Sequence, residues 1–207
     1  MKVVVYVDSF NLYYGCLKHS KFKWLDISQL CGFLFPNDEI LKIKYFTAQV
    51  KNRATDKDLD KPNRQQIYLR ALRTLPHVEI IEGTFLTHKV TMKLADKDGY
   101  ADVIKSEEKG TDVNIATHLI HDAHNNLFEK AVVISNDSDL VLPIRIAKEV
   151  LNKHITIISP YERNSIQLKA VATDVKKIRK GVLGASQFNE KMCDPVGDFF
   201  IPEKWKH

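Results

Sequence analysis

Four aspartates stand where a folded chain can bring their side chains together: Asp8, Asp112, Asp137 and Asp139. Two carboxylates about 4 Å apart repel each other by roughly 1 kcal/mol in water and by about 4 kcal/mol at an effective dielectric constant of 20. A cluster of four is therefore costly unless some of them protonate or a cation neutralises them. All-oxygen ligand sets favour hard ions such as Mg²⁺ or Mn²⁺ over zinc. We therefore expect these residues to hold one or two divalent ions, which in proteins commonly meet substrate phosphates.

The apolar runs before these aspartates indicate where they lie in the fold. Asp8 directly follows the run Lys2–Val7, and the pair Asp137 and Asp139 comes just after the short run Ala131–Ser135. Continuous apolar runs of this length are typical of parallel strands buried on both faces. In an open parallel sheet, ligands bind just beyond the carboxyl ends of the strands. The carboxylates that follow these two runs should therefore reach the same edge of one sheet.

Asp112 opens a stretch with helical periodicity. One apolar stripe recurs at about 100° per residue and consists of Val113, Ala116, Ile120, Ala123 and Leu127. By the same rule Asp112 lies about 60° from the centre of this stripe, so we expect it to lean toward the sheet. His118 would then point away from the sheet. His121 and His124 follow at three-residue intervals. Because His118 and His124 point to different sides of the helix, the three rings are not expected to bind one metal ion, and solvated histidines are the better interpretation.

The rest of the chain alternates expected strands with expected helices. The strands are Lys2–Val7, Ile40–Val50, Val78–Phe85, Ala131–Ser135, His154–Ser159 and Val175–Ile178. The helices are Asn11–Lys18, Ile27–Leu34, one with Pro62 in its first turn, one from Asp112, Leu140–Leu151 and Ser165–Ala172. This alternation indicates βαβ units, hence an α/β fold of three layers, α/β/α, with a mostly parallel central sheet. Residues 87–110 lack a clear period and suggest a long exposed excursion.

Three of the four aspartates also have a purely structural explanation. Asp8 could cap the helix that follows it, since Asp is a favoured residue at that position. Asp112 and Asp139 also lie near helix starts, where the helix dipole favours a carboxylate. Taken singly, these explanations compete with the metal site. Taken together, two strand ends and one acidic Asp-Ser-Asp pair favour a shared site.

Composition limits the class of protein. The 207 residues suit one domain, residues 1–180, with a C-terminal extension, residues 181–207, packing on it. Apolar residues make up 44% and charged residues 28%, which is typical of globular proteins. No apolar run approaches the roughly 18 residues that span a bilayer, so we expect a cytoplasmic protein without a membrane partner. The three cysteines are widely spaced without a CxxC pair, which favours free thiols.

Three short blocks resemble the signatures of the NYN domain family, in its LabA-like branch of PIN-like nucleases. They are Val5–Tyr13 (VYVDSFNLY), Glu108–Val113 (EKGTDV) and Ile134–Leu140 (ISNDSDL). The late stretch Asp194–Val196 together with Ile201–Trp205 is similar to a tail of many bacterial members, so the resemblance covers nearly the whole chain. His118 departs from the pattern, because many relatives carry an aspartate there. The resemblance implies a PIN-like Rossmannoid fold.

The same resemblance implies a function and roles for particular residues. The expected enzyme is a Mg²⁺- or Mn²⁺-dependent nuclease, an endoribonuclease that leaves a 5′-phosphate and a 3′-hydroxyl. Its catalytic and metal-binding residues would be the four aspartates named above. We assign Asn11, Ser135 and Lys109 to substrate binding, with Glu108 as a weaker candidate for an outer base or ligand. Asn136 and Ser138 more simply shape a turn.

RNA, single-stranded or structured, is the expected partner, and association of the chain into a homo-oligomer stays open. The net charge of +5 favours anionic partners. Backbone contacts could come from basic residues in loops or on helix faces: Arg53, Lys57, Arg64, Arg70, Arg73, Lys93 and Lys105. Unpaired bases could stack on Tyr13, Tyr14, Phe22 or Trp24, although packing beside the first helix explains these aromatic residues equally well.

Two other functions compete with the nuclease. Phosphotransfer at an aspartate on the first strand would require a second aspartate two residues on, where Phe10 stands. A catalytically silent RNA-binding or scaffold protein would keep the fold without turnover. The intact acidic set argues against a pure binder, because such a protein has no need to concentrate negative charge where phosphate must lie.

Overall fold

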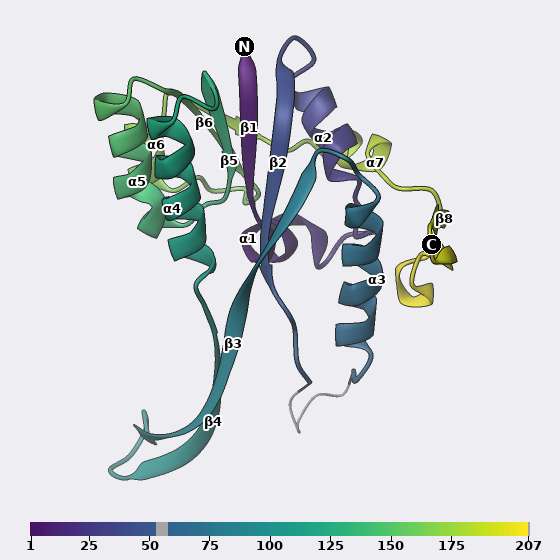
Figure 1. Ribbon diagram of the computed structural model, residues 1–207. Coiled ribbons are helices and arrows are strands. Elements are labelled where there is room, and N and C mark those ends of the chain that lie inside the picture. The colour runs from purple at the N-terminus through teal and green to yellow at the C-terminus, as the bar shows by residue number, and fades with distance from the viewer. Residues whose placement is uncertain (53–57, 207) are drawn as a thin grey trace.

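A single seven-stranded sheet forms the centre of the molecule, among the residues that the computed structural model describes, 1–52 and 58–206 (Figure 1). The strand order is β4-β3-β2-β1-β5-β6-β7. Neighbouring strands are parallel except for the antiparallel pair β3 and β4. The strands are β1 (Lys2–Asp8), β2 (Glu39–Ala48), β3 (Val78–Lys93), β4 (Tyr100–Lys109), β5 (Lys130–Ile134), β6 (His154–Ser159) and β7 (Asp174–Lys177).

Helices cover both faces of this sheet, as Figure 1 shows. One face is covered by α1 (Ser9–Leu12), the π-helical turn η1 (Tyr13–Leu17), α2 (Ile27–Leu34), α3 (Lys61–Arg73) and α7 (Lys180–Ala185). The other is covered by α4 (Thr111–His124), η2 (Ser138–Leu140), α5 (Val141–Arg145), η3 (Ile146–Val150) and α6 (Ile166–Val171). The predicted α/β fold with a mostly parallel central sheet is confirmed.

β1 contributes side chains to both hydrophobic cores. Val3, Val5 and Val7 belong to the core on the α3 face, whereas Val4 and Tyr6 belong to the core on the α4 face. All five are fully or almost fully buried, and burial of one such aliphatic side chain stabilises the fold by about 1.5–3 kcal/mol. Because strand side chains alternate between faces, a strand in the middle of the sheet has to be apolar at every position. That requirement explains the unbroken run ahead of Asp8.

The segment 87–110 is a long exposed excursion, as predicted, and it has the structure of a β-hairpin arm, which the sequence did not predict. β3 pairs with β2 only over Val78–Gly83, and from Thr84 onward it pairs only with β4. Figure 1 shows this arm projecting from the lower end of the sheet. Cross-strand contacts such as Lys89 with Asp102, at 2.6 Å, join its two strands. Both faces of the arm are largely exposed, so neither face needs an apolar pattern, and the usual strand periodicity is missing from the sequence.

Helix α4 presents a different face to the sheet from the one that the apolar stripe predicts. Its buried residues are Thr111, Ile115, Leu119, Asp122 and Ala123. By contrast, Val113 and Leu127 of the predicted stripe are exposed. The predicted stripe is confirmed at Ala123 and at Ile120, which packs against the core, and was wrong at Val113 and Leu127. The true buried face turns toward Asp122, whose partners Tyr6 and Lys44 lie far away in the chain.

Asp122 is the centre of a buried polar network beneath α4. Its Oδ2 accepts hydrogen bonds from the Tyr6 hydroxyl at 2.7 Å and from the Lys44 ammonium at 2.6 Å. Lys44 is buried in spite of its charge. His118 Nδ1 lies 3.1 Å from Lys44 Nζ, and its ring packs against Phe46. His118 therefore faces the sheet, contrary to the prediction.

The C-terminal residues contribute to the core on the α3 face. Beyond α7, a small antiparallel pair, β8 (Lys191–Asp194) and β9 (Gly197–Phe200), is followed by the short helix η4 (Glu203–Trp205). Phe188, Phe199 and Ile201 join the buried cluster, and Arg70 of α3 makes two hydrogen bonds of 2.7 Å with Asp194. A division between domain and extension at residue 180 remains a proposal.

The remaining predictions from composition can be compared directly with the fold. All three cysteines are free thiols, as expected: Cys16, Cys31 and Cys193. Over the described part of the chain, no helix is both long enough and apolar enough to cross a bilayer.

Candidate metal centre

Three of the four predicted aspartates converge at the carboxyl edge of the sheet. Asp137 follows β5, Asp139 lies in η2, and Asp112 is the second residue of α4. One carboxylate oxygen from each of these three residues lies within 4.8 Å of the others. Three anionic oxygens at this spacing, without sulfur or imidazole, form the donor set that suits a hard divalent cation such as Mg²⁺ or Mn²⁺. The residues present therefore fit such an ion.

Asp8 lies beside this cluster but outside the three-oxygen set. Only 2% of the residue is exposed, and its carboxylate is held by three hydrogen bonds from Asn11 and Ser135. Asn11 donates its backbone N–H to Oδ1 at 3.0 Å and its side-chain amide to Oδ2 at 2.8 Å, and the Ser135 hydroxyl donates to Oδ2 at 3.0 Å. The bond to the Asn11 backbone is an N-cap of α1, so the structural explanation of Asp8 also holds.

The two polar residues assigned to substrate binding, Asn11 and Ser135, thus contact Asp8. Ser135 Oγ also accepts a hydrogen bond from the backbone N–H of Asp137 at 3.1 Å, and Asn11 Oδ1 accepts one from the backbone of Asn136 at 3.2 Å. Asp137 in turn caps η2 by accepting from the Asp139 N–H at 2.9 Å. These contacts link the end of β1 to the loop after β5 and orient both aspartates, so we interpret Asn11 and Ser135 as positioning residues.

Asp112 is positioned by a tight connection between β4 and α4. Gly110 has a φ of +98°, a left-handed conformation that strains any residue with a Cβ. Glu108 then accepts hydrogen bonds from the Thr111 N–H, at 3.0 Å, and from the Thr111 hydroxyl. A Cβ on Gly83 of β3 would lie 2.8 Å from the Lys109 carbonyl oxygen, which shows how closely β3 approaches this turn. The two glycines and Glu108 therefore set the place where α4 begins.

The surroundings of Asp112 disfavour its charge. Partial burial, followed by the negative charges of Asp137, Asp8, Glu108 and Asp139, raises the pKa of its carboxyl from 3.8 to about 6. Burial likewise raises the pKa of Asp8, although the hydrogen bonds from Asn11 and Ser135 oppose this change. A carboxylate whose pKa is raised by neighbouring carboxylates is the electrostatic signature of a site that a cation would neutralise.

Replacing Asp112 by Asn should therefore stabilise the metal-free protein. The difference between pKa values of 3.8 and about 6 corresponds to at most about 3 kcal/mol, which partial exposure to solvent reduces to about 1–2 kcal/mol. The folded-state pKa is raised, so the penalty is absent below pH 3.8 and complete above about pH 6. Urea unfolding in EDTA at pH 8 should show this gain.

The same substitution at the tip of the hairpin provides the control. Asp98 is exposed, and Asp98→Asn should change stability by less than about 0.5 kcal/mol. At pH 4 the gain from Asp112→Asn should shrink, because the wild-type carboxyl is then largely protonated. An equal gain at both pH values would contradict the electrostatic explanation.

A cleft of about 460 Å³ opens onto the acidic residues. Asp8, Asp112, Asp137 and Glu108 line one side. Lys51 and Lys61 also line the cleft, together with Phe10 and Phe85, whose rings meet edge to face at 5.7 Å. The cleft therefore offers both a cation site and positive charges that can attract an anionic ligand.

The predicted phosphate-contacting residues are mostly engaged within the protein. Lys109 pairs with Glu107 at 3.0 Å, and Lys105 pairs with the same carboxylate. Arg64 is buried and pairs with Asp58, and the partly exposed Arg70 pairs with Asp194, so neither lies on a free helix face as expected. Arg73 contacts Glu82 at 3.4 Å, while Lys93 lies exposed in the arm. Arg53 and Lys57 fall outside the described residues.

The predicted stacking residues divide into two groups. Trp24 is buried in the core, and Phe22 packs against it, so for these two the packing explanation was right. Tyr13 and Tyr14 contact each other edge to face at 5.4 Å, and Tyr14 is 54% exposed. Tyr14 lines the cleft, where only the tertiary structure could place it.

Three comparisons place the chain among known proteins. The sequence model of the NYN domain family matches residues 2–178. A curated protein, 6-hydroxy-3-succinoylpyridine 3-monooxygenase HspA of Pseudomonas putida (strain DSM 28022 / S16), is 28% identical over 240 aligned residues, which cover 99% of this chain and 75% of that protein. The crystal structure of VPA0982, a protein of unknown function from Vibrio parahaemolyticus RIMD 2210633, superposes with a TM-score of 0.56 at 20% identity, covering 86% of this chain and 93% of that one.

Proposed function

The chain belongs to the NYN domain family, whose fold is PIN-like and whose members are generally nuclease-like, and from that premise we propose that it is a divalent-metal-dependent endoribonuclease. Its substrate is RNA, single-stranded or structured, and its products carry a 5′-phosphate and a 3′-hydroxyl. Its cation is Mg²⁺ or Mn²⁺, held by Asp112, Asp137 and Asp139. The observation that carries the proposal is the approach of three carboxylate oxygens to within 4.8 Å at the carboxyl edge of a parallel sheet.

Each side chain around the cluster has a separate task in this proposal. Asp112, Asp137 and Asp139 hold the ion. Asp8, kept in place by Asn11 and Ser135, contributes negative charge from beside the cluster and supports the loop that carries Asp137. A bound ion would neutralise charge on the phosphate and lower the pKa of a coordinated water molecule.

The remaining residues of the cleft position the substrate. Lys51 and Lys61 lie in the same cleft as the acidic residues, where they attract and orient the RNA phosphates. Glu108 is held by Thr111, so its main task is to fix the start of α4 and with it Asp112. Phe10 and Phe85 close the side of the cleft and restrict the access of water.

Incubation of the purified protein with end-labelled single-stranded RNA tests the proposal. Cleavage should occur with Mn²⁺ or Mg²⁺ and stop when EDTA is added, because without a cation the carboxylates repel the phosphate. The label should report internal cuts, and the new ends should accept a ligase only at the 5′-phosphate. Cleavage that continues in EDTA, or no cleavage of any RNA in Mn²⁺ despite bound metal, would contradict the proposal.

A second candidate function is oxygenation of a small heteroaromatic acid. It is favoured by the relative named as a 6-hydroxy-3-succinoylpyridine 3-monooxygenase and by an aromatic-lined cavity next to the acidic cleft. The two candidate functions can be distinguished by experiment, because they yield different products. The purified protein is incubated with 6-hydroxy-3-succinoylpyridine, O₂ and an electron donor, and the hydroxylated product is measured by mass spectrometry. Product in excess of a protein-free control supports the oxygenase, and its absence contradicts this candidate.

A further inference from the structure

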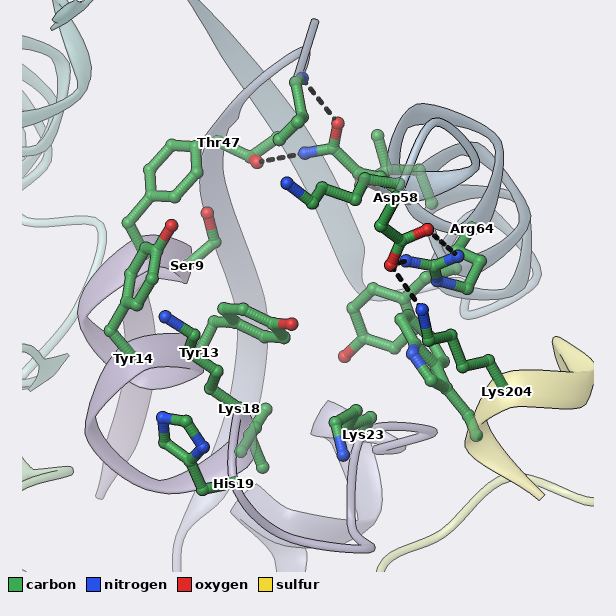
Figure 2. A pocket seen from close by; sticks show the side chains of 18 of the residues that line it. Ser9, Tyr13, Tyr14, Lys18, His19, Lys23, Thr47, Asp58, Arg64 and Lys204 are labelled. Carbon is green, nitrogen blue, oxygen red and sulfur yellow. Dashed lines mark hydrogen bonds and ion pairs between the residues drawn. The ribbon is translucent and has the colours of Figure 1, made fainter. Parts of the chain in front are cut away.

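A second cavity, of about 480 Å³, adjoins the acidic cleft, and Figure 2 shows side chains that line this cavity. The two share the wall residues Phe10, Tyr14, Val50 and Lys61, so they lie side by side. The volume lies within the roughly 300–1,000 Å³ typical of sites for small ligands. The mechanism proposed above makes no use of this cavity.

Aromatic rings form much of the cavity wall. Tyr13 and Tyr14 come from η1, and Trp205 comes from the C-terminal helix η4. Trp205 packs against Trp24 and Tyr68, with ring centroids 6.4 and 6.2 Å away. These contacts hold η4 against the core. Figure 2 shows Tyr13 and Tyr14 on one side of the cavity and Lys204, the neighbour of Trp205, on the other. These walls suit a flat ring, which stacks on aromatic side chains.

The charge of this cavity is opposite to that of the cleft beside it. Five lysines and arginines line it against one carboxylate, that of Asp58, which gives a net formal charge of +4. Asp58 bridges Arg64 and Lys204, each at 2.6 Å, as Figure 2 shows. Lys18 lies over the Tyr14 ring, 4.8 Å from its centroid. An anionic group bound among these side chains would therefore lie next to the aromatic walls.

We propose that this cavity binds one unpaired nucleotide of the RNA, next to the bond that is cut. Its base lies against the rings of Tyr14 and Trp205, and its phosphate lies near Lys18. A purely apolar ligand would make no use of the cationic side chains in the wall, and a bare phosphate would make no use of its aromatic rings, whereas a nucleotide can contact both. The inference rests on the proposed function in placing the nucleotide beside the cation site. It assigns to the C-terminal residues Lys204 and Trp205 a part in recognising substrate.

Binding of mononucleotides in EDTA tests the cavity without any metal chemistry. The probes are adenosine 5′-monophosphate, ribose 5-phosphate, which lacks the base, and adenosine, which lacks the phosphate, followed by ligand-observed NMR titration. Stacking on an aromatic side chain contributes roughly 5- to 150-fold in affinity. The complete nucleotide should therefore bind more tightly than ribose 5-phosphate by a factor in that range, and adenosine should also bind more weakly than the nucleotide.

Variants locate the binding to this cavity. Tyr14→Ala and Trp205→Ala should reduce the preference for the nucleotide over ribose 5-phosphate. Lys18→Gln should lower the affinity for adenosine 5′-monophosphate and for ribose 5-phosphate by the same factor. Tyr14 is half exposed, so its variant tests the proposal even if Trp205→Ala fails to fold. Tyr100→Ala removes an exposed ring on the distant arm, and Lys169→Gln an exposed lysine on α6; both should bind like the wild type.

Three outcomes would overturn the proposal. They are equal affinity for the nucleotide and ribose 5-phosphate, an unchanged preference in both Tyr14→Ala and Trp205→Ala, and binding of pyridine-3-carboxylate without any binding of the nucleotide. The last would make the cavity a site for small acids.

Cleavage assays then separate this inference from the nuclease proposal. In an RNA series carrying a single abasic residue at successive positions, one position next to the cut should raise KM, and this effect should disappear in Tyr14→Ala. Metal-dependent cleavage without any such position overturns the nucleotide site alone. Selective nucleotide binding in a protein that cuts no RNA overturns the nuclease alone.

Discussion

Asp137→Asn should lower the rate of RNA cleavage in Mn²⁺ by a factor on the order of 10² or more. Losing an outer partner of a metal ligand already costs about 10- to 100-fold in affinity or activity, and Asp137 is placed to bind the ion directly. Asp137 also contacts the rest of the site, because its backbone N–H donates a hydrogen bond to Ser135 Oγ and its side chain caps η2.

Asparagine is chosen because it preserves the local structure while removing the charge. The amide oxygen introduced by Asp137→Asn would still accept the hydrogen bond from the Asp139 N–H, so η2 should remain capped. The circular dichroism spectrum in EDTA should therefore resemble that of the wild type. The melting temperature in EDTA should not fall, because the variant also removes a negative charge that disfavours ionised Asp112. The stabilisation by Mn²⁺, about 2.7 kcal/mol at one hundred times the dissociation constant, should be lost in the variant.

The control for this experiment is Asp198→Asn, which removes an exposed aspartate paired with Lys191 in the β8–β9 hairpin. It should cleave RNA at the wild-type rate. Equal cleavage by wild type and Asp137→Asn would mean that the activity comes from a contaminant or from another site, and the acidic cluster would lose its assigned role.

Lys44→Met should destabilise the fold by about 3–5 kcal/mol, the cost of leaving one partner of a buried ion pair alone. Lys44 Nζ lies 2.6 Å from Asp122 Oδ2, and the two side chains are only 8% and 3% exposed. Without the ammonium, the carboxylate of Asp122 keeps one hydrogen bond from Tyr6 and one long contact with His121. Urea unfolding at pH 7 would measure the loss.

Two further variants make the interpretation specific. Lys42→Met, two residues earlier in β2, removes a lysine that is 49% exposed and pairs with Glu79 at 2.8 Å, so it should cost at most about 1 kcal/mol. The triple variant Tyr6→Phe, Lys44→Met, Asp122→Leu replaces the three buried members of the network by apolar side chains. It should recover most of the lost stability, because the one remaining member, His118, is partly exposed and can bind water. If Lys44→Met lowers the free energy of unfolding no more than Lys42→Met does, the ion pair between Lys44 and Asp122 is effectively solvated.

The pH dependence of Lys44→Met follows from the pKa of Asp122. Burial opposes the charge of this carboxyl, but the hydrogen bonds from Lys44 and Tyr6 hold its pKa below the ordinary value. With a lowered folded-state pKa, its contribution to stability is present at neutral pH and is lost as the pH falls through that folded-state value. The stabilities of wild type and Lys44→Met should therefore differ most near pH 7 and converge in acid.

The alternation of apolar runs and helical stretches was sufficient to predict the layered fold and the edge where the aspartates lie. This succeeded because strands buried on both faces need unbroken apolar sequence, as in Lys2–Val7, and because parallel strands end at a common edge. The three signature blocks added the family, which the match over residues 2–178 confirms. The strand-end rule and the signature blocks pointed to Asp137 and Asp139 at this edge, whereas Asp112 is positioned by the turn at Gly110 and Asp8 lies beside the cluster.

Contacts between distant residues decided the rest. The buried face of α4 depends on Lys44, 78 residues before Asp122 in the chain, and no local pattern reveals that such a charge will find its partner. The burial of Asp8 depends on Ser135, which is 127 residues away. The aromatic cavity depends on Trp205 packing against Trp24 and Tyr68. Apolar periodicity predicts which side chains avoid water, but a polar side chain can be buried only where the tertiary structure supplies its partner, and that information is not local.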